Sequence, residues 1–251
     1  MATSKPEMKS NSKPPRIASR DEWLAVRKAL LAEEKAVTHA QDSLAKKRRE
    51  LPWVKIEKKY VFGTPRGKKT LAELFDGRSQ LIVYHFMFGA EWKEGCPSCS
   101  MAADGFEGVT PHLSQRDVTL TAISAAPLTQ IEAFKKRLGW RFNWASSDGT
   151  DFNRDFGVSF TKEELAKPNI YNFGTMNFPA EEAPGLSVFA KNENGVFHTY
   201  STYGRGLEPL LGVYFLLDRV PKGRDEDGLS HPMSWVRHHD RYDGDKLVEL
   251  K

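Results

Sequence analysis

The run Leu81–Phe88, with the sequence LIVYHFMF, constrains the fold of this chain more than any other segment. It is apolar on both faces of an extended strand, which is typical of a central strand in a sheet covered on both sides. At eight residues it is far shorter than the ~18–20 residues that a bilayer-spanning helix needs. The run therefore predicts a buried strand of a globular α/β domain.

The segments around this run alternate between strand and helix patterns. Further strands are expected at 53–56, 118–124 and 142–147, helices at 71–75, 100–113, 128–138 and 208–217, and a hairpin at 186–190 and 196–200. Such alternation indicates an α/β sheet with helices on both faces and right-handed crossovers. The stretch 150–183 lacks a clear period and is interpreted as an insertion.

Two segments precede the domain. Residues 1–19 are polar and contain three prolines, which predicts a disordered tail. Residues 20–51 predict one long amphipathic helix, because apolar side chains recur at every seventh position: Trp23, Leu30, Val37 and Leu44. At ~1.5 Å per residue such a helix exceeds the width of a small domain. It must either wrap around the domain or dock onto a second subunit, so a homodimer formed through this helix is one expectation.

Composition and charge exclude several classes of protein. The formal net charge is +4, and much of the excess lies in the N-terminal tail without aromatic residues that could stack on bases, so no nucleic-acid partner is expected. No apolar run is long enough for a membrane span, and no signal-peptide core is visible, so neither a membrane partner nor export is expected. A cytoplasmic location follows as the default.

The only two cysteines lie three residues apart, in Cys96-Pro97-Ser98-Cys99. Two cysteines cannot build a disulfide-rich scaffold or fill a four-thiolate zinc site. Because they follow the buried strand and open a predicted helix, the helix N-terminus would favour a thiolate at Cys96. Cys99, one turn later, would resolve a mixed disulfide. The pattern predicts dithiol–disulfide chemistry with no bound organic cofactor.

Two other interpretations of the cysteines stay open. They could be inert, or they could bind copper or zinc together with His85, His112 or a C-terminal histidine. Tyr84 and His85 should point to opposite faces of their strand. His85 is interpreted as a core histidine, with a proton relay to Cys99 or a metal ligand as alternatives, and Trp92 is a further accessory candidate in the loop before Cys96.

The run from Leu81 through Cys99, followed much later by Pro184 and a hairpin strand, resembles the thioredoxin superfamily. The resemblance implies a three-layer sandwich over residues 52–220, with an insertion at about 150–183 and a C-terminal extension at 221–251. It also implies that Pro184 is a cis-proline facing the two sulfurs. The sequence departs from thioredoxin because Gly95, not tryptophan, precedes Cys96, and because the insertion could cover the sulfurs.

A closer resemblance spans roughly residues 20 to 245. Its segments are Asp21-Glu22-Trp23, Tyr84-His85-Phe86-Met87-Phe88, Cys96-Pro97-Ser98-Cys99, Tyr200-Ser201-Thr202-Tyr203-Gly204-Arg205-Gly206 and Pro221-Lys222-Gly223-Arg224-Asp225-Glu226. These are similar to a bacterial thioredoxin-like family known as domain of unknown function 899. The resemblance implies a dithiol–disulfide oxidoreductase whose partner is a protein or small thiol. The alternatives are a copper or zinc carrier and a non-catalytic interaction module dimerised by the long helix.

Overall fold

The computed structural model describes residues 16–242 and divides into two units, residues 1–51 and residues 52–251. Most of the predicted tail and residues 243–251 lie outside the described residues. In the first unit, helix α1 (Arg20–Arg49) begins at a capping box, in which the Ser19 hydroxyl accepts the backbone N–H of Glu22 and the Glu22 carboxylate accepts that of Ser19. No side chain of α1 is buried, including the predicted apolar stripe.

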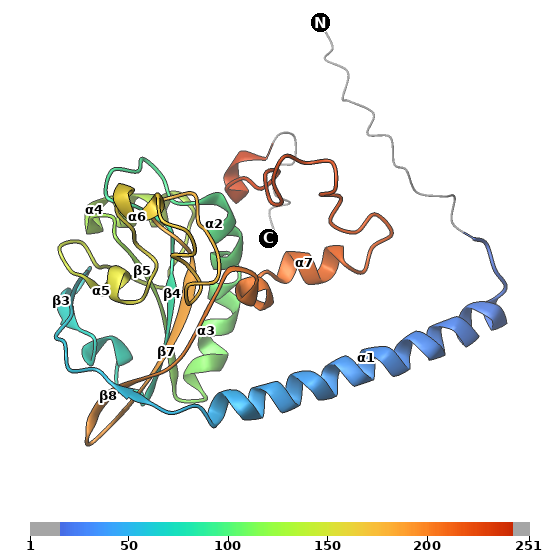
Figure 1. Cartoon of the computed structure of the whole chain (residues 1–251), viewed down its shortest axis with the longest axis horizontal. Helices are drawn as coiled ribbons and strands as arrows, with labels where there is room; N and C mark the ends of the chain where they lie inside the picture. Colours follow the sequence, from blue (N-terminus) through green and yellow to red (C-terminus); the bar gives the residue numbers. More distant parts are fainter. Residues whose placement is uncertain (1–15, 243–251) are drawn as a thin grey trace, which may run out of the picture. The chain divides into compact units, whose positions relative to one another are not determined.

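The second unit is built on one mixed sheet, whose strand order within the described residues is β1-β8-β7-β4-β5-β6-β2-β3 (Figure 1). The strands are β1 (Val54–Lys55), β2 (Val61–Thr64), β3 (Gly67–Thr70), β4 (Gln80–His85), β5 (Val118–Ser124), β6 (Asn143–Ser146), β7 (Gly185–Asn192) and β8 (Gly195–Tyr203). The α-helices are α2 (Pro97–Ala103), α3 (Phe106–Ser114), α4 (Leu128–Arg137), α5 (Phe152–Asp155), α6 (Lys162–Leu165) and α7 (Gly212–Leu217), and the 3-10 helices are η1 (Glu73–Phe75), η2 (Gly204–Leu210) and η3 (His239–Arg241).

Strand β4 lies at the centre of this sheet, as its apolar sequence predicts. It pairs in parallel with β5 and antiparallel with β7 along its whole length. Its side chains alternate between two cores: Tyr84 joins the core on one face, whereas Leu81 and Val83 join the core on the other. The central strand and the two-sided burial are therefore confirmed.

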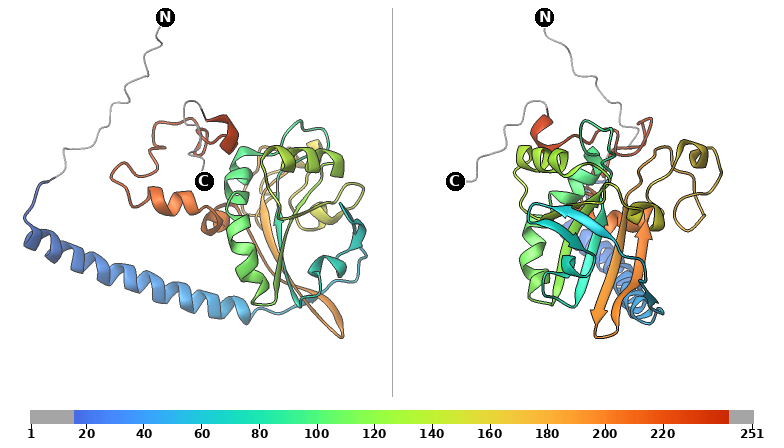
Figure 2. Two further views of the ribbon diagram at one scale, coloured as in Figure 1. Left: turned by 180° about the vertical axis from the view of Figure 1, so that it is seen from behind. Right: turned by 90° about the vertical axis from the view of Figure 1, so that its left-hand side faces the viewer.

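Helices cover both faces of the sheet, which gives three layers (Figure 2). On the first face, α2, α3 and α4 contribute Cys99, Phe106 and Phe134 to an aromatic core. On the second face, η1 and α5 contribute Phe75 and Phe152. Burial of these apolar side chains, at ~25 cal/mol per Å², favours packing of the helices against the sheet.

Two predicted elements differ from the structure: one strand is shorter, and one helix is divided into two. The strand predicted at 81–88 pairs on both sides only to His85, and beyond it Phe86 and Phe88 bond to the segment around β5 alone. The helix predicted over 100–113 is two helices, α2 and α3, which meet at Asp104–Gly105. The second departure follows from glycine, which has a low helix propensity.

The expectation of a cis-proline at Pro184 is wrong. No peptide bond among residues 16–242 is cis, so the Ala183–Pro184 bond is trans. The chain enters β7 in extended form, because the Ala183 N–H donates to the Val158 carbonyl (2.8 Å) and Gly185 pairs with His85. An extended entry suits a trans peptide bond, the more stable isomer. The insertion, which supplies Val158, therefore determines how the chain approaches Pro184.

The C-terminal extension is folded around one carboxylate. Glu226 accepts hydrogen bonds from the Tyr214 hydroxyl (2.8 Å), the Met233 backbone N–H (2.9 Å) and the Trp235 indole N–H (2.6 Å). These bonds connect α7 to the segment that follows it and lead the chain to Val236, which is buried. No helix within residues 16–242 combines the length and the apolar character that a bilayer span requires.

Candidate active site

The two cysteines lie where the chain turns from β4 into α2. The Cys96 backbone N–H donates to the Met87 carbonyl (3.0 Å), which holds the loop against the extension of β4. Cys96 is the N-cap of α2, and Pro97 is its first residue, as the sequence predicts. The Cys96 carbonyl accepts both the backbone N–H and the hydroxyl of Ser100 (2.9 Å each). Cys96 therefore has a defined position at the start of the helix.

Solvent access differs between the two thiols. Cys96 is half-buried, whereas Cys99 is buried, with 2% of its surface exposed. Both are free cysteines. Cys96 is therefore the more accessible of the two residues.

The environment of Cys96 favours its thiolate. Its pKa is lowered to about 7, chiefly because the Cys99 thiol donates a hydrogen bond to it, and also because the backbone N–H groups of Cys99 and Ser98 and the Ser98 hydroxyl point toward it. Burial works in the opposite direction. A thiol with a pKa near 7 is about half thiolate at neutral pH, and only the thiolate attacks a disulfide.

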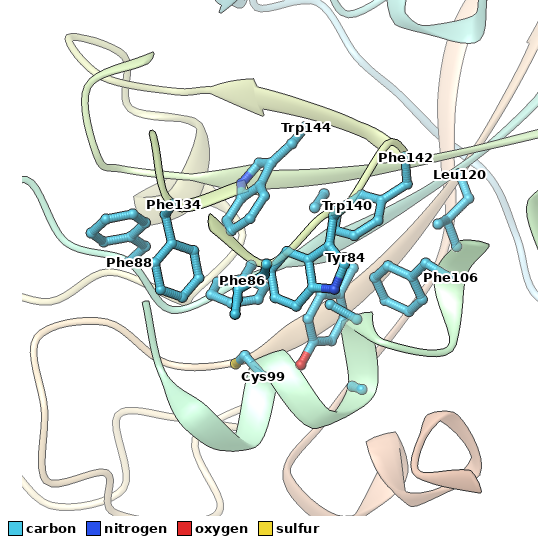
Figure 3. Packing of buried hydrophobic residues seen from close by; sticks show 14 of the residues in the cluster. Tyr84, Phe86, Phe88, Cys99, Phe106, Leu120, Phe134, Trp140, Phe142 and Trp144 are labelled. Atoms are coloured by element: carbon cyan, nitrogen blue, oxygen red, sulfur yellow. The ribbon is translucent and has the colours of Figure 1, made fainter. Parts of the chain in front are cut away.

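Cys99 has the opposite electrostatics. Burial raises its pKa well above the ordinary value, and its hydrogen bond to Cys96 raises it further. The Tyr84 hydroxyl and the Met87 backbone N–H act against this by stabilising the Cys99 thiolate. Burial also raises the pKa of Tyr84, so its hydroxyl stays protonated and able to donate (Figure 3). Of the accessory residues named from the sequence, Tyr84 is the one that the structure brings to the cysteine pair.

An aromatic cluster leaves no room for a side chain before Cys96. A Cβ atom on Gly95 would lie 2.6 Å from the Phe86 ring and 3.0 Å from the Phe134 ring. Both rings belong to the core that also holds Cys99 (Figure 3). Glycine at position 95 is thus a packing requirement, which explains the absence of the tryptophan found there in thioredoxin.

The other accessory candidates are His85 and Trp92. His85 is on the opposite face of the sheet, stacked on Phe152 and Phe156 with its Nε2 2.8 Å from the Ser187 hydroxyl. It is a core histidine, as the sequence interpretation preferred. The Trp92 ring packs on Gly89.

Pro184 lies at the edge of the site. It follows Ala183 into β7 at the end of the sheet where β4 leads into the cysteine loop. Its carbonyl accepts a hydrogen bond from Tyr171, whose hydroxyl also accepts the Gly204 backbone N–H. The predicted role of Pro184 in shaping a substrate groove stays a prediction.

Of the histidines considered as metal ligands, the C-terminal His238 contacts the cysteine loop, through the Gly95 carbonyl. His85 is on the other face of the sheet, His112 is exposed on α3, and His239 bonds to Asp104. Residues 16–242 contain no group of three or more His, Cys, Asp or Glu side chains placed to hold a metal ion. The sequence analysis missed a different contribution: residues 236–241 dock against the loop that precedes Cys96.

The central strand, the Cys-x-x-Cys segment at the start of α2 and the antiparallel β7–β8 hairpin beside β4 define a thioredoxin-like α/β protein. The chain belongs to the family described as bacterial protein of unknown function (DUF899), whose model matches residues 12–242. A search of curated proteins found no match.

Solved structures with similar folds have low sequence identity to this chain. Peroxiredoxin Q of Xanthomonas campestris, in a cysteine-to-serine mutant form, is 14% identical, with a TM-score of 0.42 over 62% of this chain and 90% of that one. Peroxidoxin BcpB of Mycobacterium tuberculosis is 13% identical, with a TM-score of 0.42 over 64% and 93%. A DsbE-type putative thiol:disulfide interchange protein of Chlorobium tepidum is 11% identical, with a TM-score of 0.39 over 65% and 97%.

Proposed function

We propose that this protein is a thiol–disulfide oxidoreductase in which Cys96 is the nucleophile and Cys99 the resolving thiol. The observation that carries the proposal is the asymmetry of the pair: a half-buried thiol with a pKa near 7 accepts a hydrogen bond from a buried thiol whose pKa is raised. The two thiols therefore suit two successive steps. The less buried and more acidic thiol, that of Cys96, reacts first.

In the reducing direction, the Cys96 thiolate attacks one sulfur of a substrate disulfide. The substrate S–S bond breaks, a mixed disulfide forms at Cys96, and the first substrate sulfur leaves as a thiolate. Cys99 then loses its proton to a departing thiolate and attacks the Cys96 sulfur. The second substrate sulfur leaves, and Cys96–Cys99 becomes a disulfide. Two electrons have passed to the substrate, and an external dithiol must return them.

Tyr84 supports the second step. As Cys99 loses its proton, negative charge develops on a buried sulfur, which costs free energy unless a donor is present. The Tyr84 hydroxyl is such a donor, and it remains protonated because burial raises its pKa. No organic cofactor enters the scheme. The partner would be a protein or small thiol in a reducing compartment, consistent with the cytoplasmic location expected from the sequence.

The test is a redox titration of the purified full chain with metals chelated, read by thiol labelling. We expect one reversible two-electron transition at roughly −200 to −280 mV. In a Cys99→Ser variant, a disulfide substrate should remain attached to Cys96 as a mixed disulfide. If no intramolecular disulfide forms at any potential, the proposal fails. Stoichiometric zinc or copper retained without chelator would instead favour the metal-carrier interpretation.

We also propose that α1 mediates homodimerisation. Its apolar stripe is solvent-exposed in this structure, with exposed fractions of 48% for Trp23, Leu30 and Leu44 and 57% for Val37. Asp21 and Glu22 lie in its first turn and four basic residues in its last turn, so an antiparallel second copy would place opposite charges side by side. Val37→Glu should convert a dimer into a monomer in sedimentation equilibrium, whereas His39→Glu on the same helix should not. A monomeric wild-type protein would refute this proposal.

A further inference from the structure

A segment from the C-terminal extension contacts the residue immediately before the nucleophile. The Nε2 atom of His238 lies 2.8 Å from the Gly95 carbonyl oxygen, and its Nδ1 lies 2.6 Å from the guanidinium of Arg137. Because a carbonyl only accepts and a guanidinium only donates, these partners require the neutral tautomer with its proton on Nε2. His238 therefore donates to Gly95 and accepts from Arg137.

This hydrogen bond determines the orientation of one peptide unit. The carbonyl of the Gly95–Cys96 peptide accepts from His238, and the N–H of the same peptide donates to the Met87 carbonyl (3.0 Å). The peptide is thus held at both ends, once by the C-terminal segment and once by the extension of β4. Gly95 has no side chain that could hold the loop in place. The Phe86 and Phe134 rings occupy the space where a Cβ atom at this position would lie.

His238 is itself held in place from several directions. Its side chain is buried, with 4% of its surface exposed, and its ring packs edge-on against Phe134 with centroids 5.1 Å apart. Arg137, which bonds its Nδ1, also pairs with Asp240 (3.1 Å) and with Glu94. A side chain with both ring nitrogens bonded and little exposed surface cannot adopt another rotamer at low cost.

Two further contacts attach the same segment to the site. Arg241 pairs with Glu94 (2.7 Å), the neighbour of Gly95. His239 lies 2.6 Å from Asp104, the C-cap residue of α2, and the Trp140 indole donates to the same carboxylate oxygen (2.8 Å). The segment therefore bridges the loop before Cys96 and the far end of the cysteine helix.

We propose that His238 is a positioning residue for Cys96. Cys96 holds its low pKa only while its sulfur stays close to the Cys99 thiol and to the N–H groups at the start of α2. Fixing the Gly95–Cys96 peptide keeps the sulfur there, in the manner of a supporting group around a preorganised site. The effect on turnover rests on the proposed oxidoreductase function, whereas the effect on the Cys96 thiolate does not.

The test compares three variants of the full chain: His238→Ala, His238→Gln and His239→Ala. The readout is the rate of Cys96 alkylation by iodoacetamide as a function of pH, in a Cys99→Ser background and in the natural chain. His238→Ala loses both hydrogen bonds. His238→Gln keeps a donor for Gly95 and an acceptor for Arg137. His239→Ala weakens docking of the segment without touching the Gly95–Cys96 peptide.

We expect His238→Ala to raise the pKa of Cys96 by about one unit, which lowers the alkylation rate at pH 7 about fivefold. His238→Gln should restore most of that rate, and His239→Ala should change it by less than about twofold. Two results would overturn the proposal: an unchanged Cys96 pKa in His238→Ala, or equal shifts in His238→Ala and His239→Ala. If His238→Ala shifts the pKa of Cys96 but the natural protein exchanges no disulfides, His238 remains a positioning residue and only the proposed oxidoreductase function is refuted.

Discussion

Both faces of β4 carry polar groups within a hydrophobic core, but the surroundings of these groups differ. On the face of Tyr84, the cysteine pair lies at the start of α2, and Cys96 is partly exposed. On the face of His85, a chain of hydrogen bonds runs from His85 through Ser187 and Ser201 to His198, at 2.8 Å for each step. The comparison teaches that burial alone does not make a reactive group: access and unpaired N–H donors separate the first face from the second.

A buried acid lies beside α5, one of the helices on the second face. Glu182 accepts hydrogen bonds from Ser159 (2.8 Å) and, at 3.4 Å, from Asn153, and no basic side chain is among the groups that shift its pKa. Burial raises the pKa of Glu182 to about 7, whereas burial lowers the pKa of His85 to about 3. Burial therefore shifts both groups toward their neutral forms.

The largest expected effect is on the rate of disulfide exchange, and it should differ between variants on the two faces of β4. Cys96→Ser removes the thiol of the less buried cysteine and should lower disulfide exchange at least ~1,000-fold. His85→Gln, one strand residue beyond Tyr84 and on the other face, should leave the exchange rate within about twofold. The measurement is reduction of a small aromatic disulfide under single-turnover conditions. Loss of exchange in His85→Gln at full folding would show that the two faces are not independent.

The next effect concerns the pH dependence of stability. An acid whose pKa is about 7 in the folded state and ordinarily about 4.5 binds more protons when folded, so stability falls as pH rises through that window. Glu182→Gln should therefore be more stable than the natural chain by roughly 2–4 kcal/mol at pH 8, with the gain shrinking toward pH 5. Urea unfolding at a series of pH values checks this.

His85 should give the opposite dependence of folding stability on pH, so it serves as the comparison for Glu182. Its pKa is about 3 when folded and ordinarily about 6.5, so the unfolded chain binds more protons below pH 6.5 and stability falls as pH decreases toward 3. His85→Gln should flatten this acid-side loss and leave the alkaline side unchanged. If both variants gave parallel pH curves, the assignment of the two slopes to these residues would be wrong.

The smallest effect should come from Tyr84. Tyr84→Phe removes the donor to Cys99 and should slow the resolving step about tenfold, which corresponds to about 1.4 kcal/mol for a hydrogen bond to a charged group. Alkylation of Cys96 should be unchanged, because Tyr84 acts on the second thiol. Trapping of the mixed disulfide over time measures the step. Equal slowing of both reactions would mean that the variant disturbs the loop as a whole.

The sequence predicted the parts of this molecule that depend on local pattern. The apolar run at 81–88, the cysteine spacing and the proline at the first helical position located the central strand, the loop and the start of α2. The opposite orientation of Tyr84 and His85 followed from strand geometry. These features depend on neighbours within a few residues, which a single sequence displays.

Other features depend on residues far apart in the chain. The hydrogen bond between Ala183 and Val158, beside Pro184, and the contact of His238 with Gly95 each join segments that are separate in the sequence. The exclusion of any side chain at position 95 follows from two rings on different elements. No periodicity or spacing carries such information, and the cis bond at Pro184 that the resemblance to thioredoxin implied is absent from residues 16–242.

The distance along the chain between Gly95 and His238 also has a consequence for biosynthesis. The two residues are 143 positions apart, so at about 5–20 residues per second the ribosome adds His238 roughly 7–30 s after Gly95. During that interval the nascent chain carries both cysteines without the partner that orients the peptide before the first of them. Cys96 therefore acquires its complete surroundings late in translation, after the sheet strands have been made.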